Sequence, residues 1–340
     1  MSYFEDSCNQ FLKEYQGSNP GAAISIIKNG KTYNKCYGIA NMETNTPVNS
    51  STNFRLASMT KPFTSMCIMI LAQKGKLSID DTLRDIIPEF PSYADNITIR
   101  DMLHHTSGIA RSILTENYIG QLRERDVLKI YLNLTSTDYE PRTKMQYSND
   151  AYVLLGIIIE RVSELSFSEF MEREIFKKLG MNSSVLHNVG VTQVKNRAYG
   201  YTRYGDNFGF CDQSQTSLLL GDGGVYSSLN DLYKWEQTLY SESLVSMEIL
   251  EMALTSGVLN NGEKIGYGFG WYLDEWHGYD LVFHGGASIG FKNMHLRVPD
   301  LQYSIILLTN RNELDWNFPV GTEDKDKNRY MLDLFGSDLF

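Results

Sequence analysis

A serine and a lysine stand three residues apart, Ser58 and Lys61, where an extended segment turns into a helix. The helix that follows, residues 63–71, is apolar on nearly every side, and a helix of that kind is buried. Residues three apart share one face of a helix, so the Lys61 amine can reach the Ser58 hydroxyl. The pattern therefore predicts a central, buried helix that presents a serine beside a lysine at its N-terminus.

This pair has a chemical meaning. A serine hydroxyl is a weak nucleophile until a base takes its proton, and the N-terminal end of a helix stabilises a developing oxyanion. A Ser-x-x-Lys spacing by itself also arises at ordinary helix starts. The assignment of Ser58 as a nucleophile therefore depends on partners elsewhere in the chain.

Length and charge exclude several classes of protein. The 340 residues are 42% hydrophobic and allow two domains or one catalytic unit with two lobes. The net charge of −10, without a basic cluster, argues against nucleic acid and anionic membranes as partners. No apolar run approaches the roughly 18 residues of a membrane span. Residues 1–6 lack a basic region followed by an apolar one, so we expect no secretory signal and a cytoplasmic location.

Strand patterns lie at both ends of the chain. Asn29-Gly30 separates the runs 22–28 and 31–38, which is the strongest short signal for a hairpin. Between residue 76 and about residue 200 the pattern is mostly helical. We therefore expect one antiparallel sheet built from both termini, with a helical insertion. The C-terminal strands are expected at residues 268–273, 279–283, 291–298 and 303–309.

Two further segments offer partners for Ser58. Tyr147 and Asn149 lie two apart before a helix, and alternate residues of an extended segment point the same way; the other interpretation is a capped helix start. His284 and Gly286 directly follow a strand, where glycine permits close approach by a ligand. Taken alone, that second segment is better explained by a hairpin turn with an incidental histidine.

The three motifs together carry a resemblance. In the order Ser58-x-x-Lys61, Tyr147-x-Asn149 and His284-x-Gly286, the chain resembles the serine β-lactamase and penicillin-binding-protein superfamily. It is most similar to the branch that contains class C β-lactamases, DD-peptidases, D-aminopeptidases and esterases. The resemblance runs from about residue 5 to about residue 312, and it also covers the segments 97–109, 223–228 and 267–271.

The resemblance implies an α+β fold, with an antiparallel β-sheet flanked by helices plus an all-helical lobe. We assign residues 1–75 and 265–340 to the sheet domain and residues 76–264 to the helical lobe, with the active site in the cleft between them. The chemistry implied is that of a serine hydrolase acting through an acyl-enzyme, with no cofactor, no metal and a small molecule or short peptide as substrate. The oligomeric state stays open.

The resemblance also implies the roles of single residues. Ser58 is the nucleophile, and either Lys61 or Tyr147 accepts its proton. The backbone N–H groups of Ser58 and Ala287 form an oxyanion hole. The substrate-binding residues are Asn149, His284, Gly286 and Ala287.

Two positions depart from the family pattern. Many β-lactamases place a lysine where this chain has His284, and a histidine is mostly neutral at pH 7, so a fixed anchor for a substrate carboxylate is lost. This favours small D-amino-acid amides, peptides or esters over a true β-lactamase or DD-carboxypeptidase. If the charge of His284 matters, activity titrates between about pH 5.5 and 7.5. Arg142 replaces a common glycine, so we expect a type I turn there.

Two alternatives accompany this interpretation. A catalytically silent ligand-binding protein on the same fold is the alternative from another class, although such relatives usually lose the serine, lysine or tyrosine. The neighbours His104 and His105 could form a metal pair, but no third ligand is evident. The resemblance explains one of these histidines as a structural turn residue.

Overall fold

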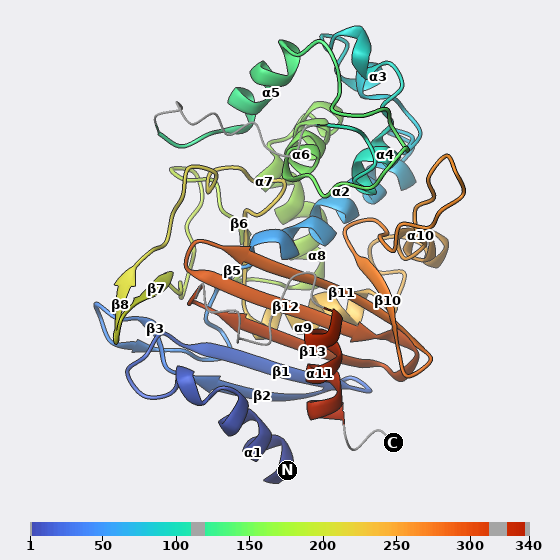
Figure 1. The fold of residues 1–340 in the computed structure, drawn as a ribbon. Coiled ribbons are helices and arrows are strands. Elements are labelled where there is room, and N and C mark those ends of the chain that lie inside the picture. The colour runs from blue at the N-terminus through green and yellow to red at the C-terminus, as the bar shows by residue number, and fades with distance from the viewer. Residues whose placement is uncertain (1, 110–119, 313–324, 337–340) are drawn as a thin grey trace.

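The computed structural model describes residues 2–109, 120–312 and 325–336 (Figure 1). At its centre lies a six-stranded antiparallel sheet in the order β10-β11-β12-β13-β1-β2. Ala22 of β1 lies opposite Thr309 of β13, so strands from both ends of the chain form one sheet. This confirms the α+β fold expected from the sequence. The strands are β1 (Ala22–Lys28), β2 (Lys31–Tyr37), β10 (Tyr272–Trp276), β11 (Tyr279–Ser288), β12 (Phe291–Val298) and β13 (Tyr303–Thr309).

The turn between β1 and β2 is the one that the sequence predicts. Asn29 and Gly30 have φ values of 49° and 74°, and positive φ at both central residues is the signature of a type I′ hairpin turn. The predicted strand 268–273 is wrong in its bounds, since β10 begins at Tyr272. Gly270 has a φ of 80°, and a Cβ there would lie 2.8 Å from the Pro62 nitrogen. This glycine packs against the start of the central helix instead of continuing a strand.

Alternate residues of β1 belong to two different cores. Ala22 and Ile24 pack with helices α1 and α11, whereas Ala23 and Ile27 join the larger core around α2, α6 and α9. Side chains along a strand alternate between the faces of the sheet, so helices cover both faces. The helices named are α1 (Ser2–Phe11), α2 (Lys61–Gln73), α6 (Asn149–Ser163), α9 (Leu229–Thr238) and α11 (Lys325–Gly336).

The remaining helices gather mainly beyond α2, on the side away from the sheet (Figure 1). No helix in the described ranges is long and apolar enough to cross a membrane. The division of the chain into the domains 1–75 with 265–340 and 76–264 stays a prediction. The shorter helices are η1 (Lys13–Tyr15), η2 (Ala57–Thr60), α3 (Leu83–Ile86), η3 (Ser92–Ala94), α4 (Ile99–Leu103), α5 (Glu124–Leu132), α7 (Phe167–Met171), the π-helix η4 (Glu172–Phe176), α8 (Lys177–Leu179), α10 (Met247–Ala253) and η5 (Pro299–Leu301).

Several short strands have no counterpart among the predicted elements. In a three-stranded sheet, β9 pairs with both β5 and β6, and β5 immediately precedes the serine-bearing turn η2. The short strands are β3 (Ile39–Asn41), β4 (Thr46–Pro47), β5 (Phe54–Arg55), β6 (Val185–Leu186), β7 (Tyr201–Tyr204), β8 (Asn207–Phe210) and β9 (Val225–Ser227).

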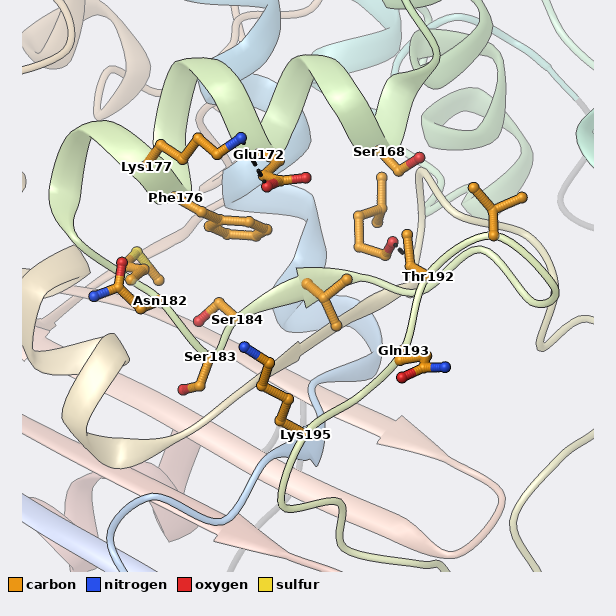
Figure 2. Close-up of a pocket in the computed structure, with 14 residues that line it drawn as sticks. Ser168, Glu172, Phe176, Lys177, Asn182, Ser183, Ser184, Thr192, Gln193 and Lys195 are labelled. Atoms are coloured by element: carbon orange, nitrogen blue, oxygen red, sulfur yellow. Dashed lines mark hydrogen bonds and ion pairs between the residues drawn. The ribbon is translucent and has the colours of Figure 1, made fainter.

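A hollow of about 410 Å³ lies between α7, η4, β6 and the segment 191–195 (Figure 2). Glu172 and Lys177 form an ion pair of 3.0 Å along its wall. None of its lining residues belongs to the Ser58 site predicted from the sequence. The hollow is therefore separate from the site described next.

Candidate active site

Ser58 lies in η2, which leads directly into the buried helix α2. The residue before it, Ala57, has a φ of 50°, a left-handed conformation that is uncommon for a residue with a side chain. Backbone strain of this kind clusters at functional sites. The turn leaves Ser58 half-buried at the start of α2, as the spacing with Lys61 predicts.

Lys61 is fully buried, and three oxygen atoms surround its amine. Its Nζ lies 3.2 Å from Ser58 Oγ, 2.9 Å from Asn149 Oδ1 and 3.1 Å from the carbonyl oxygen of Asp222. Burial lowers the pKa of Lys61 to about 8, and the negative charges of Asp222 and Asp150 partly oppose that shift. The amine therefore titrates near neutral pH, within hydrogen-bonding reach of the Ser58 hydroxyl.

The Tyr147 phenol also reaches the Ser58 hydroxyl, through a hydrogen bond with it. The Tyr147 ring lies nearly parallel to that of Tyr272, at 6.3 Å and 7°, and 4.8 Å from Lys61 Nζ. Burial, followed by the neighbouring Tyr272, raises the pKa of Tyr147 well above 10. To accept the Ser58 proton near neutral pH, Tyr147 would need a lowered pKa. The environment of Tyr147 instead keeps its phenol protonated.

Asn149 is the first residue of α6, directly after the N-cap Ser148, whose side chain accepts a hydrogen bond from the Ala151 N–H. The helix α6 therefore also has the capped start that the alternative interpretation predicts, and its N-cap is Ser148. Asn149 is exposed. Because its Oδ1 faces Lys61 Nζ, its Nδ2 group is left to donate elsewhere.

His284 lies on β11 and is buried, with both ring nitrogens next to protein groups. Nδ1 lies 2.6 Å from the Gly285 carbonyl oxygen and Nε2 lies 3.1 Å from the Tyr267 hydroxyl. A carbonyl only accepts, so Nδ1 carries the proton and Nε2 accepts from Tyr267. Burial, with a smaller effect of Lys61, lowers the pKa of His284 to about 3. Burial therefore argues against the expected titration of His284 between pH 5.5 and 7.5, because it favours the neutral ring throughout that range.

Gly286 brings β11 against the backbone that leads to Ser58. A Cβ at this position would lie 1.9 Å from the Leu56 carbonyl oxygen, so only glycine allows this contact. Asn293, opposite Gly286 on β12, donates from Nδ2 to the Arg55 carbonyl oxygen at 2.8 Å. The exposed Ala287 follows on the same strand. The structure thus places Gly286 and Ala287 beside the serine-bearing turn.

The loop before Tyr147 differs from its predicted form. Arg142 has a φ of 63°, and the Thr143 N–H donates to the Glu140 carbonyl oxygen at 3.2 Å. A positive φ at the third residue is the signature of a type II turn, so the predicted type I turn is wrong. Arg142 also pairs with the buried Asp101 at 2.9 Å. This ion pair holds the arginine in a conformation that glycine would adopt without strain.

Some residues of the site were not predicted as functional. Asp222 contributes its carbonyl oxygen to Lys61, and its position between glycines, in Gly221–Gly224, is the only signal in the sequence. Tyr267 lies in the segment 267–271, which we noted only for its resemblance to the family, and Tyr272 directly follows that segment. No group of three or more His, Cys, Asp or Glu side chains in the described ranges could hold a metal ion.

The fold and the Ser58 site together define a class of protein. A family model described as Beta-lactamase matches residues 8–326, and the chain belongs to that family of serine hydrolases and penicillin-binding proteins. It is 32% identical over 304 residues to penicillin-binding protein 4* of Bacillus subtilis and 29% identical over 316 residues to protein flp of Staphylococcus aureus. These matches cover 83% and 87% of the chain, but the chain spans only 66% and 61% of those relatives' length.

Solved structures agree with this assignment. The octameric penicillin-binding protein homologue from Pyrococcus abyssi has a TM-score of 0.81 at 26% identity, over 99% of this chain and 77% of that one. A D-amino acid amidase from Ochrobactrum anthropi SV3, solved with L-phenylalanine amide, also has a TM-score of 0.81, at 20% identity and 99% coverage of both chains. The second likeness concerns the fold alone.

Proposed function

We propose that this chain is a serine hydrolase that forms an acyl-enzyme at Ser58 and cleaves small amides, D-amino-acid peptides or esters. The observation that carries the proposal is the position of the Ser58 hydroxyl. Its Oγ lies 3.2 Å from Lys61 Nζ and hydrogen-bonds with the Tyr147 phenol. A nucleophile with a base in reach and a third group orienting them is the arrangement that acyl transfer requires.

The charge states favour Lys61 as the first proton acceptor. With a pKa of about 8, a fraction of Lys61 is a neutral amine at pH 7, while Tyr147 stays a phenol. Lys61 takes the Ser58 proton as Oγ bonds to the substrate carbonyl carbon. When the bond to the leaving group breaks, that group takes a proton from the Tyr147 phenol. The Lys61 ammonium then gives a proton to Tyr147, which becomes a phenol again. Water then attacks the acyl carbon and gives a proton to the neutral Lys61 amine, and Ser58 Oγ takes that proton back as its bond to the acyl carbon breaks.

Substrate binding follows from the positions of the remaining residues. We assign the backbone N–H groups of Ser58 and Ala287 to the oxyanion, and the Nδ2 group of Asn149 to a substrate carbonyl. Gly286 keeps β11 close enough to η2 for both N–H groups to serve one oxygen atom. His284 borders this site through Tyr267, and its two nitrogens are already bonded within the protein.

The choice of substrate rests on charge. At the position where many β-lactamases carry a lysine, the buried and neutral His284 offers no cation for a substrate carboxylate. This supports neutral amides and esters over β-lactams. The likeness in fold to a D-amino acid amidase is compatible with the same choice. Penicillin hydrolysis or DD-carboxypeptidase activity is the second candidate, favoured by the similarity to penicillin-binding protein 4*.

Covalent labelling tests the proposal directly. The wild-type protein is incubated with a fluorophosphonate or a fluorescent penicillin, and the adduct is located by mass spectrometry. We expect an adduct on Ser58 with the fluorophosphonate and none in Ser58→Ala. If neither reagent labels the wild type, a silent ligand-binding protein becomes the better description. Nitrocefin and p-nitrophenyl esters and p-nitroanilides of D- and L-amino acids then rank the substrate classes.

The pH dependence of labelling is a second prediction. Because Lys61 must be neutral to accept a proton and its pKa is lowered to about 8, the rate of fluorophosphonate labelling should rise with pH through a midpoint near that pKa and level off roughly one pH unit above it. Tyr147 keeps its proton, so we expect no fall below about pH 10. Rates measured from pH 5 to 10 check this. A midpoint between pH 5.5 and 7.5 would instead indicate a titrating histidine.

A further inference from the structure

The loop that carries Tyr147 is docked along the turn that follows α4. A row of backbone N–H groups in the loop donates to acceptors in that turn, and Gly108 makes the approach possible, since a Cβ there would lie 2.1 Å from the Tyr139 carbonyl oxygen. These bonds run from Asp138 N to Gly108 O (2.9 Å), from Arg142 N to Thr106 O (2.8 Å), from Gln146 N to His105 O (2.9 Å) and from Ser148 N to His105 Nδ1 (3.0 Å).

The last two bonds of this row bracket the catalytic tyrosine. His105 holds the backbone on both sides of Tyr147, with its carbonyl oxygen on Gln146 and its Nδ1 on Ser148. Its fully buried ring also lies against the Tyr147 ring, with 4.4 Å between centroids. One residue thereby fixes the phenol's backbone at two points and restrains its ring.

We propose that His105 is a positioning residue for catalysis, which holds the Tyr147 hydroxyl at Ser58 through the bond from Ser148 N–H to its Nδ1. The inference rests on the proposed function and extends it to a residue outside the reacting atoms. The neighbouring His104 is only half-buried. His104 makes none of these bonds to the loop; its ring packs on Phe269 at 4.9 Å.

The state of the His105 ring suits this role. Because Nδ1 accepts from Ser148, the ring proton lies on Nε2, which has no hydrogen-bond partner within the described ranges. Burial, followed by the charge of Lys61, lowers the pKa of His105 well below its ordinary value. The ring thus keeps its acceptor at neutral pH. The backbone of His105 has a φ of 59°, a left-handed conformation that Asn and His adopt far more readily than Phe.

These facts select the variants for a test. His105→Asn keeps an acceptor near the position of Nδ1 and tolerates the left-handed backbone. His105→Phe keeps a ring but removes the acceptor, and His105→Ala removes both. His104→Asn and His104→Phe are matched controls, because His104 is a neighbouring histidine whose Nε2 is likewise buried without a partner in the described ranges.

The readout is the second-order rate constant for fluorophosphonate labelling of Ser58 at 25 °C, with folding checked by circular dichroism. We expect His105→Phe and His105→Ala to label about 10–100-fold more slowly, since small displacements of a catalytic group cost rates of that order. His105→Asn should recover most of the rate, and both His104 variants should label like the wild type. A purely structural role would lower the thermal midpoint without changing the rate in folded protein.

The outcomes separate the two proposals. If the wild type is not labelled, the proposed function itself fails. If the wild type is labelled and folded His105→Phe or His105→Ala reacts at the same rate, the positioning role is wrong and the serine hydrolase stands. If His105→Phe does not fold, His105→Ala against His105→Asn decides. Equal slowing of Asn, Phe and Ala would also overturn the role of the Nδ1 acceptor.

Discussion

Replacing Lys61 with methionine should slow fluorophosphonate labelling of Ser58 by about 10²–10⁴-fold, the usual contribution of a positioned general base. Methionine has nearly the length of lysine and fills the same fully buried space. It cannot accept the Ser58 proton over the 3.2 Å that separates Nζ from Oγ. Because a buried amine is costly to desolvate, we expect the thermal midpoint to remain at the wild-type value or to rise.

Labelling rates and melting curves of Lys61→Met and the wild type check this expectation. Lys76→Met is the matched control, since Lys76 is exposed just beyond the end of α2. That variant should label like the wild type. A Lys61→Met protein that is labelled at the wild-type rate would exclude Lys61 as the acceptor and assign the proton to Tyr147.

Alanine in place of Gly286 should be the most damaging small change in the sheet. The new methyl group would lie 1.9 Å from the Leu56 carbonyl oxygen, two residues before Ser58. The backbone at Gly286 and the backbone at Leu56 are both restrained from moving apart. Asn293 pairs with Gly286 in the sheet and also donates to the Arg55 carbonyl oxygen. We expect a loss of stability of about 1–3 kcal/mol from overpacking. Labelling should fall about 10²–10³-fold, as when one oxyanion donor is lost.

Gly223→Ala is the control for this variant. A Cβ at Gly223 would meet its nearest atom, in Ala57, at an ordinary 3.6 Å, so both the labelling rate and the urea midpoint should stay near the wild-type values. Urea unfolding and labelling of the two alanine variants provide the comparison. Wild-type labelling of Gly286→Ala would show that β11 need not touch the serine-bearing turn.

Much of the fold could be predicted because its signals are local. The run 63–71 is apolar on nearly every side and forms most of the buried helix α2, and Asn29-Gly30 forms the hairpin turn. Other elements gave no such signal. Strands of two or three residues, such as β5 and β9, are too short to show an alternating pattern. Their pairing joins residue 54 to residue 227, a tertiary contact that no local window contains.

For the candidate site, the residues could be predicted from the sequence but their surroundings could not. The spacing of Ser58 and Lys61 could be interpreted from one helical turn, and the resemblance pointed to Tyr147, Asn149 and His284. The environment of these groups could not be predicted, because it is made by distant chain segments. Lys61 meets Asp222 across 161 positions of sequence. The neutral state of His284 and the protonated phenol of Tyr147 both follow from burial that only the folded chain creates.

The pairing of β1 with β13 has a consequence for biosynthesis. The ribosome completes β1 almost three hundred residues before its partner β13, since Ala22 pairs with Thr309. Contacts this distant in sequence slow folding and leave hydrophobic strands exposed in the meantime. Nascent chains that end before β11 contain Ser58 and Lys61 but lack Gly286 and the strand that packs against the serine-bearing turn. The Ser58 site is therefore complete only after the C-terminal strands of the sheet have been translated.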